Sequence, residues 1–485
     1  MIAHSFLNSV TPIIQLRSDR IYLAPVPYSL LPTPYSLLPT PYSLLMDTNA
    51  AELQEKIRQQ FDFGPYPRIP IDRSPKKQLS LLYFHNLVTP YYLRNHQVIN
   101  SDQKVILDAG CGTGYGTLTL AEANPGAKII GIDISEQSLD LARKRLSHYG
   151  FDDAEFHQLS LYDLPSAGWE FDYINCDELL YLFPDPAVAL KAMKAVLKPQ
   201  GIIRSNLHSK HQRHLYFRAQ EVFHVMGLFD DNPEDMEIDI ALNTMKALKN
   251  NVELKAQTWN HKYEGEDGKE RVLMNYLFQG DKGYTIPDLF AGLRAANLEF
   301  ISMVHWRQWD LMSLFKEPDN LPVFLAMSLP DISVEDRLHL FELLHPVHRL
   351  LDFWCGHPEQ GQSFTPISEW TLSDWQKAKV HLHPQLNILD VKQDMLKAIT
   401  ELQPFEISRY LPVSGVQSLV DSAVASCLLP LFDSPQSMPS LVERWQRLRP
   451  VDPVTLESIS DQKAFDTVKE ALMGLENYGY VLVEG

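Results

Sequence analysis

Short apolar runs and helical patterns alternate along the first half of the chain. Four runs have the length and composition of buried strands, namely Lys104–Leu107, Lys128–Asp133, Ala154–Leu159 and Phe171–Asp177. Helical patterns lie between them, and a further one, Ala187–Lys198, leads into a fifth strand-like run. Strands that alternate with helices predict an α/β fold in which a mostly parallel sheet is doubly wound, as in Rossmann-like proteins.

Helical spacing dominates after the fifth run. We expect a helical insertion near residues 207–270, followed by a turn, a helix and a strand over Gly283–Val304. The α/β domain is then expected to end near Trp309, which assigns it residues 101–310.

The remaining residues, 311–485, predict a mainly helical C-terminal domain. The segment Leu338–Trp354 is apolar and helical in pattern but is interrupted at Pro346. The tail Phe465–Val483 shows an amphipathic helix followed by a strand, the order in which a winged-helix-like unit ends. This tail is acidic, which favours contact with protein or substrate over contact with DNA.

The N-terminal region carries a tandem repeat of seven residues over Val26–Met46. A coiled coil is excluded because a proline recurs every seventh residue, at Pro27, Pro34 and Pro41. We expect residues 1–45 to be disordered and hypothesise that translation starts at Met46. Residues 46–100 are expected to form a lid and approach segment for the α/β domain.

Composition narrows the classes of partner. The chain has 43 Lys+Arg against 61 Asp+Glu, a net charge of −18, so binding to nucleic acid or to anionic membranes is disfavoured. Its four cysteines are widely spaced, which argues against a disulfide scaffold and favours a reducing, cytoplasmic setting. No apolar run predicts a membrane span, and the first residues do not resemble a secretion signal. The oligomeric state is left open.

A glycine-rich turn follows the first strand. Asp108 ends that strand, and Gly110, Gly112 and Gly114 follow it before a helix begins. Glycines allow a tight turn and a close approach of the backbone to a ligand at the helix N-terminus. Asp133, at the end of the second strand, stands where a carboxylate binds ribose hydroxyls in such folds.

The string VILDAGCGTGYG, followed by GIDIS, resembles the first motif of class I S-adenosylmethionine (SAM)-dependent methyltransferases. A nicotinamide-binding protein usually shows G-x-G-x-x-G after a nearly apolar strand, whereas an acid precedes the turn here. The resemblance implies a seven-stranded sheet and SAM as cofactor. It also implies that Asp108, Gly110, Gly112 and Gly114 hold the methionine end of SAM and that Asp133 holds the ribose.

The loop after the third strand departs from the family pattern. Related methyltransferases usually have an acid beside the adenine, and Ser160 occupies that position here, followed by Leu161. The resemblance therefore implies that Ser160 and Leu161 contact the adenine. Asp163 is the alternative acceptor, although it fits equally well as the cap of a turn before Pro165.

The end of the fourth strand is expected to face the transferable methyl group. Asn175, Cys176 and Asp177 lie there, because ligands of doubly wound folds bind at the carboxyl ends of the strands. Cys176 is assigned to cofactor binding and Asp177 to catalysis. Methyltransferases that act on adenine amino groups carry (D/N)PPY at this place, so the sequence Asn-Cys-Asp-Glu disfavours that substrate class.

Two further residues are candidates for the catalytic end. Tyr66 lies in the segment Phe61–Pro70, whose prolines and aromatic residues predict an irregular lid that excludes water, or equally a clamp for the N-terminal arm. His208 follows the fifth strand, where a base could accept a proton from the substrate. Tyr181 is more readily explained as a packing residue.

Metal binding is not expected. His208, His211 and His214 are spaced by three, but no acid or cysteine completes a ligand set. A second group contains His345, His348, Cys355 and His357, and Pro346 distorts its spacing.

The sequence therefore predicts an enzyme that transfers methyl groups from SAM to an unidentified acceptor. The Pro-Tyr-Pro element at residues 65–67 resembles bacterial protein lysine methyltransferases and methyltransferases linked to tetratricopeptide repeats, which makes a protein side chain a candidate acceptor. A small-molecule acceptor stays open, as does a SAM-binding regulatory protein without turnover.

Overall fold

The computed structural model describes residues 48–265, 267–413, 417–452 and 455–485. The expected disorder of residues 1–45 and the proposed start at Met46 lie outside these ranges and stay predictions. Within the described part of the chain, no helix is long and apolar enough to cross a membrane.

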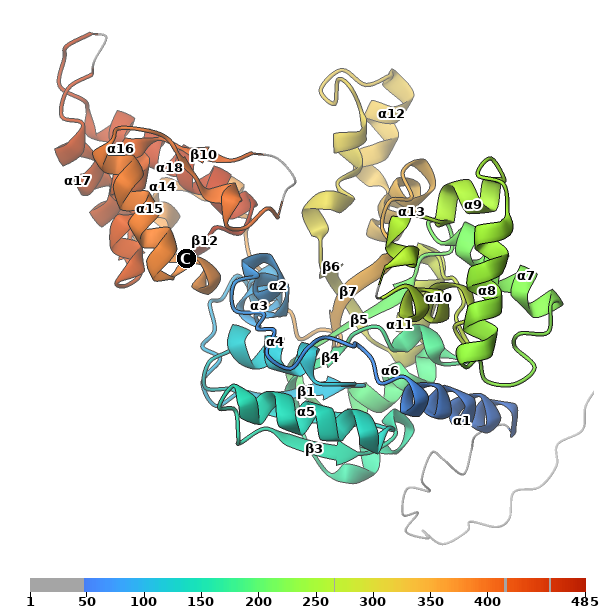
Figure 1. Cartoon of the computed structure of the whole chain (residues 1–485). Helices are drawn as coiled ribbons and strands as arrows, with labels where there is room; N and C mark the ends of the chain where they lie inside the picture. The colour runs from blue at the N-terminus through green and yellow to red at the C-terminus, as the bar shows by residue number, and fades with distance from the viewer. Residues whose placement is uncertain (1–47, 266, 414–416, 453–454) are drawn as a thin grey trace, which may run out of the picture. The chain divides into compact units, whose positions relative to one another are not determined.

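One sheet of seven strands forms the centre of the α/β domain, in the order β3-β2-β1-β4-β5-β7-β6 (Figure 1). β1 to β5 run parallel, and β7 is antiparallel to both of its neighbours. The fold class expected from the sequence is confirmed. The strands are β1 (Val105–Ala109), β2 (Lys128–Asp133), β3 (Glu155–Gln158), β4 (Phe171–Cys176), β5 (Leu197–His208), β6 (Glu299–Met303) and β7 (Leu350–Gly356).

Successive residues of each central strand point to opposite faces of the sheet, so the domain has two cores. Ile106 and Tyr173 are paired across β1 and β4 and pack on one face with Leu118 of α4 and Leu146 of α5. The neighbouring pair on the opposite face, with α6 and α11, consists of Leu107 and Ile174. The helices are α4 (Tyr115–Ala123), α5 (Glu136–His148), α6 (Pro186–Ala195) and α11 (Ile286–Ala296). Burial on both faces explains why these strands are almost continuously apolar.

The sheet continues beyond the boundary expected near Trp309. The segment Leu338–Trp354 is helical only in its first part: α13 (Val334–Leu344) ends before Pro346, and β7 begins at Leu350. The expectation of a helix up to Trp354 is therefore wrong. A proline cannot continue a helix, and six of the seven residues of β7 are buried as in a central strand.

The helical insertion expected near residues 207–270 contains α7 (His214–Val225), α8 (Asp235–Ala247), α9 (Glu253–Thr258) and α10 (Gly268–Tyr276). These helices share a small core of their own that includes Phe223, Met245 and Tyr276. From residue 48 onward, where the described part of the chain begins, three helices precede the sheet: α1 (Thr48–Phe63), α2 (Leu79–His85) and α3 (Val88–Asn95). A short helix, α12 (Val323–Ser328), lies between β6 and α13.

The C-terminal region has a separate core around Trp375, Leu472 and Val481. Its last helix is followed by a strand, as expected, and that strand pairs antiparallel with β8. Tyr92 of α3 attaches this strand, because its hydroxyl accepts a hydrogen bond from the backbone N–H of Val483 at 3.0 Å. The elements are α14 (Leu372–Lys377), β8 (Lys379–Leu382), α15 (Leu389–Thr400), β9 (Phe405–Glu406), β10 (Leu419–Val420), α16 (Ser422–Leu428), β11 (Gln436–Ser437), α17 (Met438–Leu448), α18 (Asp461–Asn477) and β12 (Val481–Glu484).

Candidate functional site

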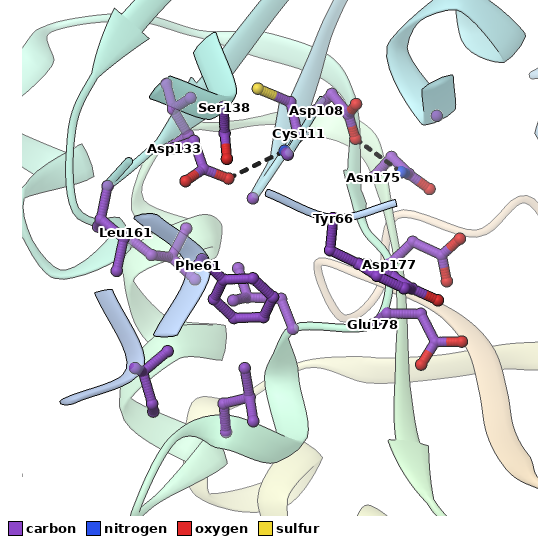
Figure 2. A pocket seen from close by; sticks show the side chains of 18 of the residues that line it. Phe61, Tyr66, Asp108, Cys111, Asp133, Ser138, Leu161, Asn175, Asp177 and Glu178 are labelled. Atoms are coloured by element: carbon purple, nitrogen blue, oxygen red, sulfur yellow. Dashed lines mark hydrogen bonds between the residues drawn. The ribbon is translucent and has the colours of Figure 1, made fainter. Parts of the chain in front are cut away.

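A cavity of about 350 Å³ lies at the carboxyl ends of β1, β2 and β4. Figure 2 shows Asp133 and Leu161 on one side of this cavity, Asp177 and Glu178 on the other, and Phe61 and Tyr66 between them. The cavity therefore has two ends, called here, after the roles expected from the sequence, the cofactor end, around Asp108 and Asp133, and the acceptor end, around Asp177 and Glu178.

Asp108 is the buried carboxylate of the cofactor end. One of its oxygens accepts a hydrogen bond from Thr117 Oγ1 at 2.6 Å. The other accepts from Asn175 Nδ2 at 2.8 Å (Figure 2). Burial raises the pKa of Asp108 to about 6, although both hydrogen bonds act in the opposite direction. A buried acid that is ionised at neutral pH and only partly compensated suits a cationic ligand group.

The glycine turn brings the backbone of the lid segment close to β1. At Gly112, where φ is +50°, an added Cβ would lie 2.3 Å from the carbonyl oxygen of Tyr66. Gly110 has φ +76° and faces Leu179. Gly114 is not one of the described residues that line the cavity, and an added Cβ there would lie 2.7 Å from Ala142, so its role is the packing of α4 against α5.

Asp133 is positioned by the same turn. Its carboxylate accepts hydrogen bonds from the backbone N–H groups of Gly112 and Ser135, each at 2.9 Å. The pKa of Asp133 is raised by burial, while these backbone N–H groups hold it down. Each carboxylate oxygen retains a lone pair for a ligand hydroxyl.

Helix α1 covers the cofactor end. Phe61 and Ile57 line the cavity, and Ser135 Oγ donates a hydrogen bond to Asp62 at 2.6 Å. Ser160 and Leu161 line the cavity as predicted, and Ser160 Oγ lies 2.8 Å from Gln54 Nε2 on α1.

Asp163, the alternative acceptor, is absent from the described lining of the cavity. Its backbone N–H donates to the carbonyl of Ser160 at 3.0 Å in a short 3₁₀ helix, Leu161–Ala167. The cap of this helix is Ser160, whose Oγ accepts the backbone N–H of Tyr162 at 3.3 Å, so Asp163 lies in the turn but is not its cap.

The segment around Tyr66 is both a wall of the cavity and a clamp. The buried guanidinium of Arg145 donates to the carbonyls of Ile69, Pro70 and Thr113 at 2.6 to 2.9 Å, which joins this segment to the glycine turn. Burial, followed by the charge of Glu178, raises the pKa of Tyr66 to about 12. Tyr66 is therefore a neutral hydrogen-bond donor at physiological pH. Arg68 is exposed and does not contribute to the described lining.

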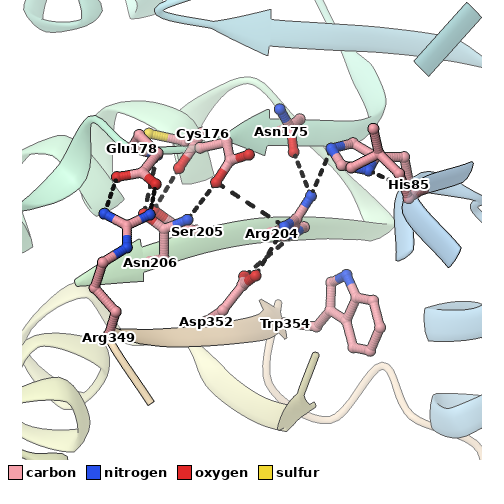
Figure 3. Close-up of polar contacts among 12 residues, drawn as sticks. His85, Asn175, Cys176, Glu178, Arg204, Ser205, Asn206, Arg349, Asp352 and Trp354 are labelled. Carbon is pink, nitrogen blue, oxygen red and sulfur yellow. Dashed lines mark hydrogen bonds and ion pairs between the residues drawn. The ribbon is translucent and has the colours of Figure 1, made fainter. Parts of the chain in front are cut away.

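Asp177 and Glu178 form the acceptor end. Asn206 on β5 donates through its side chain to Asp177 and accepts the backbone N–H of Glu178 at 2.9 Å. Glu178 forms a bidentate ion pair with Arg349 (Figure 3). Burial raises the pKa of Glu178, but the charge of Arg349 outweighs it and holds the pKa well below its usual range. Glu178 is thus ionised throughout the physiological range.

His208 is placed differently from the expectation. The ring is buried, and its Nδ1 lies 2.6 Å from Asp281, which also accepts from Arg213 at 2.9 Å. The ring of Tyr181 stacks on the imidazole of His208, with 3.7 Å between the ring centroids. His208 is outside the described lining of the cavity, so the structure does not bring it to the acceptor end, and its role as a base stays a prediction. Its Nε2 lies 3.6 Å from the carboxylate of Glu178, so the ring packs behind that side chain.

A second buried ion pair fixes the neighbouring strands. Arg204 on β5 binds Asp352 on β7 through two hydrogen bonds of 2.7 and 3.1 Å, and it donates to His85 Nε2 at 2.8 Å (Figure 3). Burial and the charge of Arg204 lower the pKa of His85 to about 4, so this ring is neutral and accepts. These contacts hold β5 and β7 together beneath Asp177.

Cys176 does not contact the cavity within the described lining. The side chain is fully buried at the end of β4, and burial raises its pKa to about 12. The alternation of a strand explains this position, because Asn175 and Asp177 flank Cys176 and point to the other face.

Sequence reasoning missed Glu178, Arg349, Arg204 and Asp352. Glu178 could have been found from its position directly after Asp177 at the strand end, whereas the arginines carry no local signal. Among the described residues no group of three or more His, Cys, Asp or Glu side chains could hold a metal ion.

Comparisons with known proteins agree with this geometry. The family model for a methyltransferase domain matches residues 100–279. A solved structure of PKMT2 from Rickettsia typhi superposes with a TM-score of 0.54 at 16% identity, covering 83% of this chain and 74% of that chain. The same protein in complex with AdoHcy gives a TM-score of 0.53.

Two sequence relatives differ in how much they cover. An uncharacterized protein of Synechococcus sp. is 27% identical over 324 residues, which is 66% of this chain and 74% of that protein. The ubiquinone biosynthesis O-methyltransferase of Actinobacillus pleuropneumoniae serotype 7 is 36% identical over 105 residues, 21% of this chain and 44% of that enzyme. The chain thus spans less than half of this second relative.

Proposed function

We propose that residues 100–279 bind SAM as a class I methyltransferase domain and that the chain methylates an amino group of a protein side chain. The observation that carries this proposal is the pair of carboxylates, Asp177 and Glu178, at the end of the cavity opposite the ribose-binding acid. We further propose that the catalytic domain comprises residues 101–356, preceded by the lid in residues 46–100.

The cofactor end fits SAM. Gly112 lines the cavity without a side chain, Asp108 offers a buried negative charge to the methionine ammonium, and Asp133 has free lone pairs for the ribose hydroxyls. When bound, SAM supplies an electrophilic methyl group on a sulfonium. The chain's own residues must therefore align the acceptor, exclude water and take up a proton.

An amine is the acceptor that the other end favours. Asp177 attracts a protonated amine, and its carboxylate is one-third exposed, so it is accessible to take the proton. Tyr66 keeps its own proton and therefore cannot act as the base, which assigns it to orientation of the acceptor. Glu178 stays ionised and neutralises the Arg349 guanidinium, so this guanidinium does not repel a protonated amine near the reacting position.

The size of the cavity favours a side chain over a free metabolite. Pockets that enclose a drug-sized ligand have volumes of roughly 300 to 1,000 Å³. The cavity here, about 350 Å³, is at the lower limit, so SAM itself accounts for most of it. An acceptor must then enter from outside, as a slender side chain on a larger molecule does.

The test is transfer of labelled methyl from SAM to extract of the native host by the purified full chain. We expect label in protein that is recovered as methylated amino acid after hydrolysis, and no label with Asp108→Ala. The Asp177→Asn variant should bind SAM and transfer little. Label confined to small molecules would refute the protein acceptor, and SAM binding with no transfer to any fraction would support a regulatory role instead.

A further inference from the structure

Helix α1 places an amide at the far side of the cofactor end. Asp108 and Asp133 lie at the carboxyl ends of β1 and β2, and Ser160 follows β3; these three strands are adjacent in the sheet. Because the methionine end and the ribose occupy the first two positions, the base must lie beside the third. Gln54 lines the cavity at that place, with its Nε2 at 2.8 Å from Ser160 Oγ.

The surroundings suit a flat aromatic base. Apolar side chains form walls there, and the polar groups are concentrated at one edge. The apolar walls are Leu53, Ile57, Leu161 and Phe183. Walls of this kind cover the faces of a ring, while recognition of one base over another needs hydrogen bonds at its edge.

We propose that Gln54 reads the hydrogen-bonding edge of the adenine ring, in place of the acid that Ser160 replaces. Its half-buried amide has one group engaged by Ser160, and its Oε1 has no recorded partner among the described residues. That oxygen can accept from the exocyclic amino group of adenine. The inference rests on SAM occupying this cavity, as the proposed function requires.

An amide and a carboxylate read a base differently. A serine hydroxyl both donates and accepts, so the Gln54 amide can rotate by half a turn and still bond to Ser160. After the rotation its NH₂ group faces the ligand and can donate to a carbonyl oxygen. A carboxylate at this edge can only accept while it is ionised, and it repels a carbonyl oxygen. Gln54 therefore tolerates hypoxanthine as well as adenine, and an acid does not.

The experiment uses calorimetric titration of the full chain with two probes, S-adenosylhomocysteine and S-inosylhomocysteine. We expect the wild type to bind both, with Kd values within about fivefold of each other, because the Gln54 amide can form a hydrogen bond with either base. Gln54→Glu should keep its affinity for S-adenosylhomocysteine. Its affinity for S-inosylhomocysteine should fall about tenfold or more, because the carboxylate then faces the carbonyl oxygen of hypoxanthine and both groups are hydrogen-bond acceptors.

Rescue separates recognition from packing. Gln54→Ala should weaken S-adenosylhomocysteine about tenfold, and adding Ser160→Asp should restore that binding but not binding of the inosyl compound. Gln59→Ala, at an exposed position of the same helix, is the matched control, and melting temperatures verify folding.

Two results would overturn the inference. One is an unchanged Kd for S-adenosylhomocysteine in Gln54→Ala, and the other is a Gln54→Glu variant that treats the two probes as the wild type does. Failure of the folded wild type to bind S-adenosylhomocysteine at all would instead overturn the proposed function, and this inference with it.

Discussion

The two ends of the cavity are built in opposite ways. The cofactor end comes from consecutive segments, since Asp108, Gly112 and Asp133 lie within about 25 residues of each other. The acceptor end joins residues from distant strands, and the partners Glu178 and Arg349 are 171 positions apart. Local geometry therefore specifies the cofactor end, whereas the acceptor end depends on completion of the whole sheet.

The largest effect is expected from Gly112→Ala. The new Cβ would meet the carbonyl of Tyr66 at 2.3 Å, and φ of +50° is unfavourable for alanine, so the turn must open. We expect the Kd for S-adenosylhomocysteine to rise by about 100-fold or more. Gly150→Ala is the matched control, because φ is +80° there but an added Cβ meets nothing within 4 Å. Equal Kd values for the two variants would contradict a close approach at Gly112.

Asp108→Asn is expected to weaken S-adenosylhomocysteine by about 30-fold, the value of a hydrogen bond to a charged group. Wild-type affinity should also fall as the pH drops through about 6, the pKa of this buried acid. The apo protein should respond in the opposite direction. A raised pKa stabilises the fold below the unfolded pKa of 3.8, and this contribution is lost as the pH rises through about 6.

Calorimetry and thermal melting at pH 8 check both parts of this prediction. The Asp108→Asn variant should melt no lower than the wild type while binding less tightly. A variant that binds weakly only because it has partly unfolded would refute the role of the charge.

Glu178→Gln moves the test to the acceptor end. It leaves the Arg349 guanidinium without its carboxylate beside the entrance, so a cationic acceptor is repelled. We expect methyl transfer to fall by about tenfold while the Kd for S-adenosylhomocysteine changes less than about twofold. Initial rates with the labelled acceptor fraction measure the first quantity. The double variant Glu178→Gln/Arg349→Gln should recover part of the loss, and an additive loss would contradict the charge argument.

His208→Gln should have the smallest effect, a decrease in rate of about threefold. Because the ring lies behind Glu178, the acid limb of the pH–rate profile should keep its position. A shift or loss of that limb would show that His208 is the base after all. His214→Gln, at an exposed position, controls for loss of a histidine.

How well each part of the structure could be predicted from the sequence depends on the same difference between local and distant contacts. β2 was predicted with its observed bounds because a buried parallel strand is continuously apolar, and Asp133 ends it visibly. β7 has the same apolar character but follows a helix that shares its pattern, so only Pro346 separated the two. Arg204 and Asp352 meet through pairing of β5 with β7, a contact that no local period encodes.

The position of β7 has a consequence for how the protein is made. β5 and β6 leave the ribosome before β7 exists, yet β7 lies between them in the finished sheet. A nascent chain must therefore hold an unpaired strand edge open until Gly356 has been synthesised, about three quarters of the way along 485 residues. Synthesis that stalls within this interval exposes an unpaired, apolar strand edge, which is a site of aggregation.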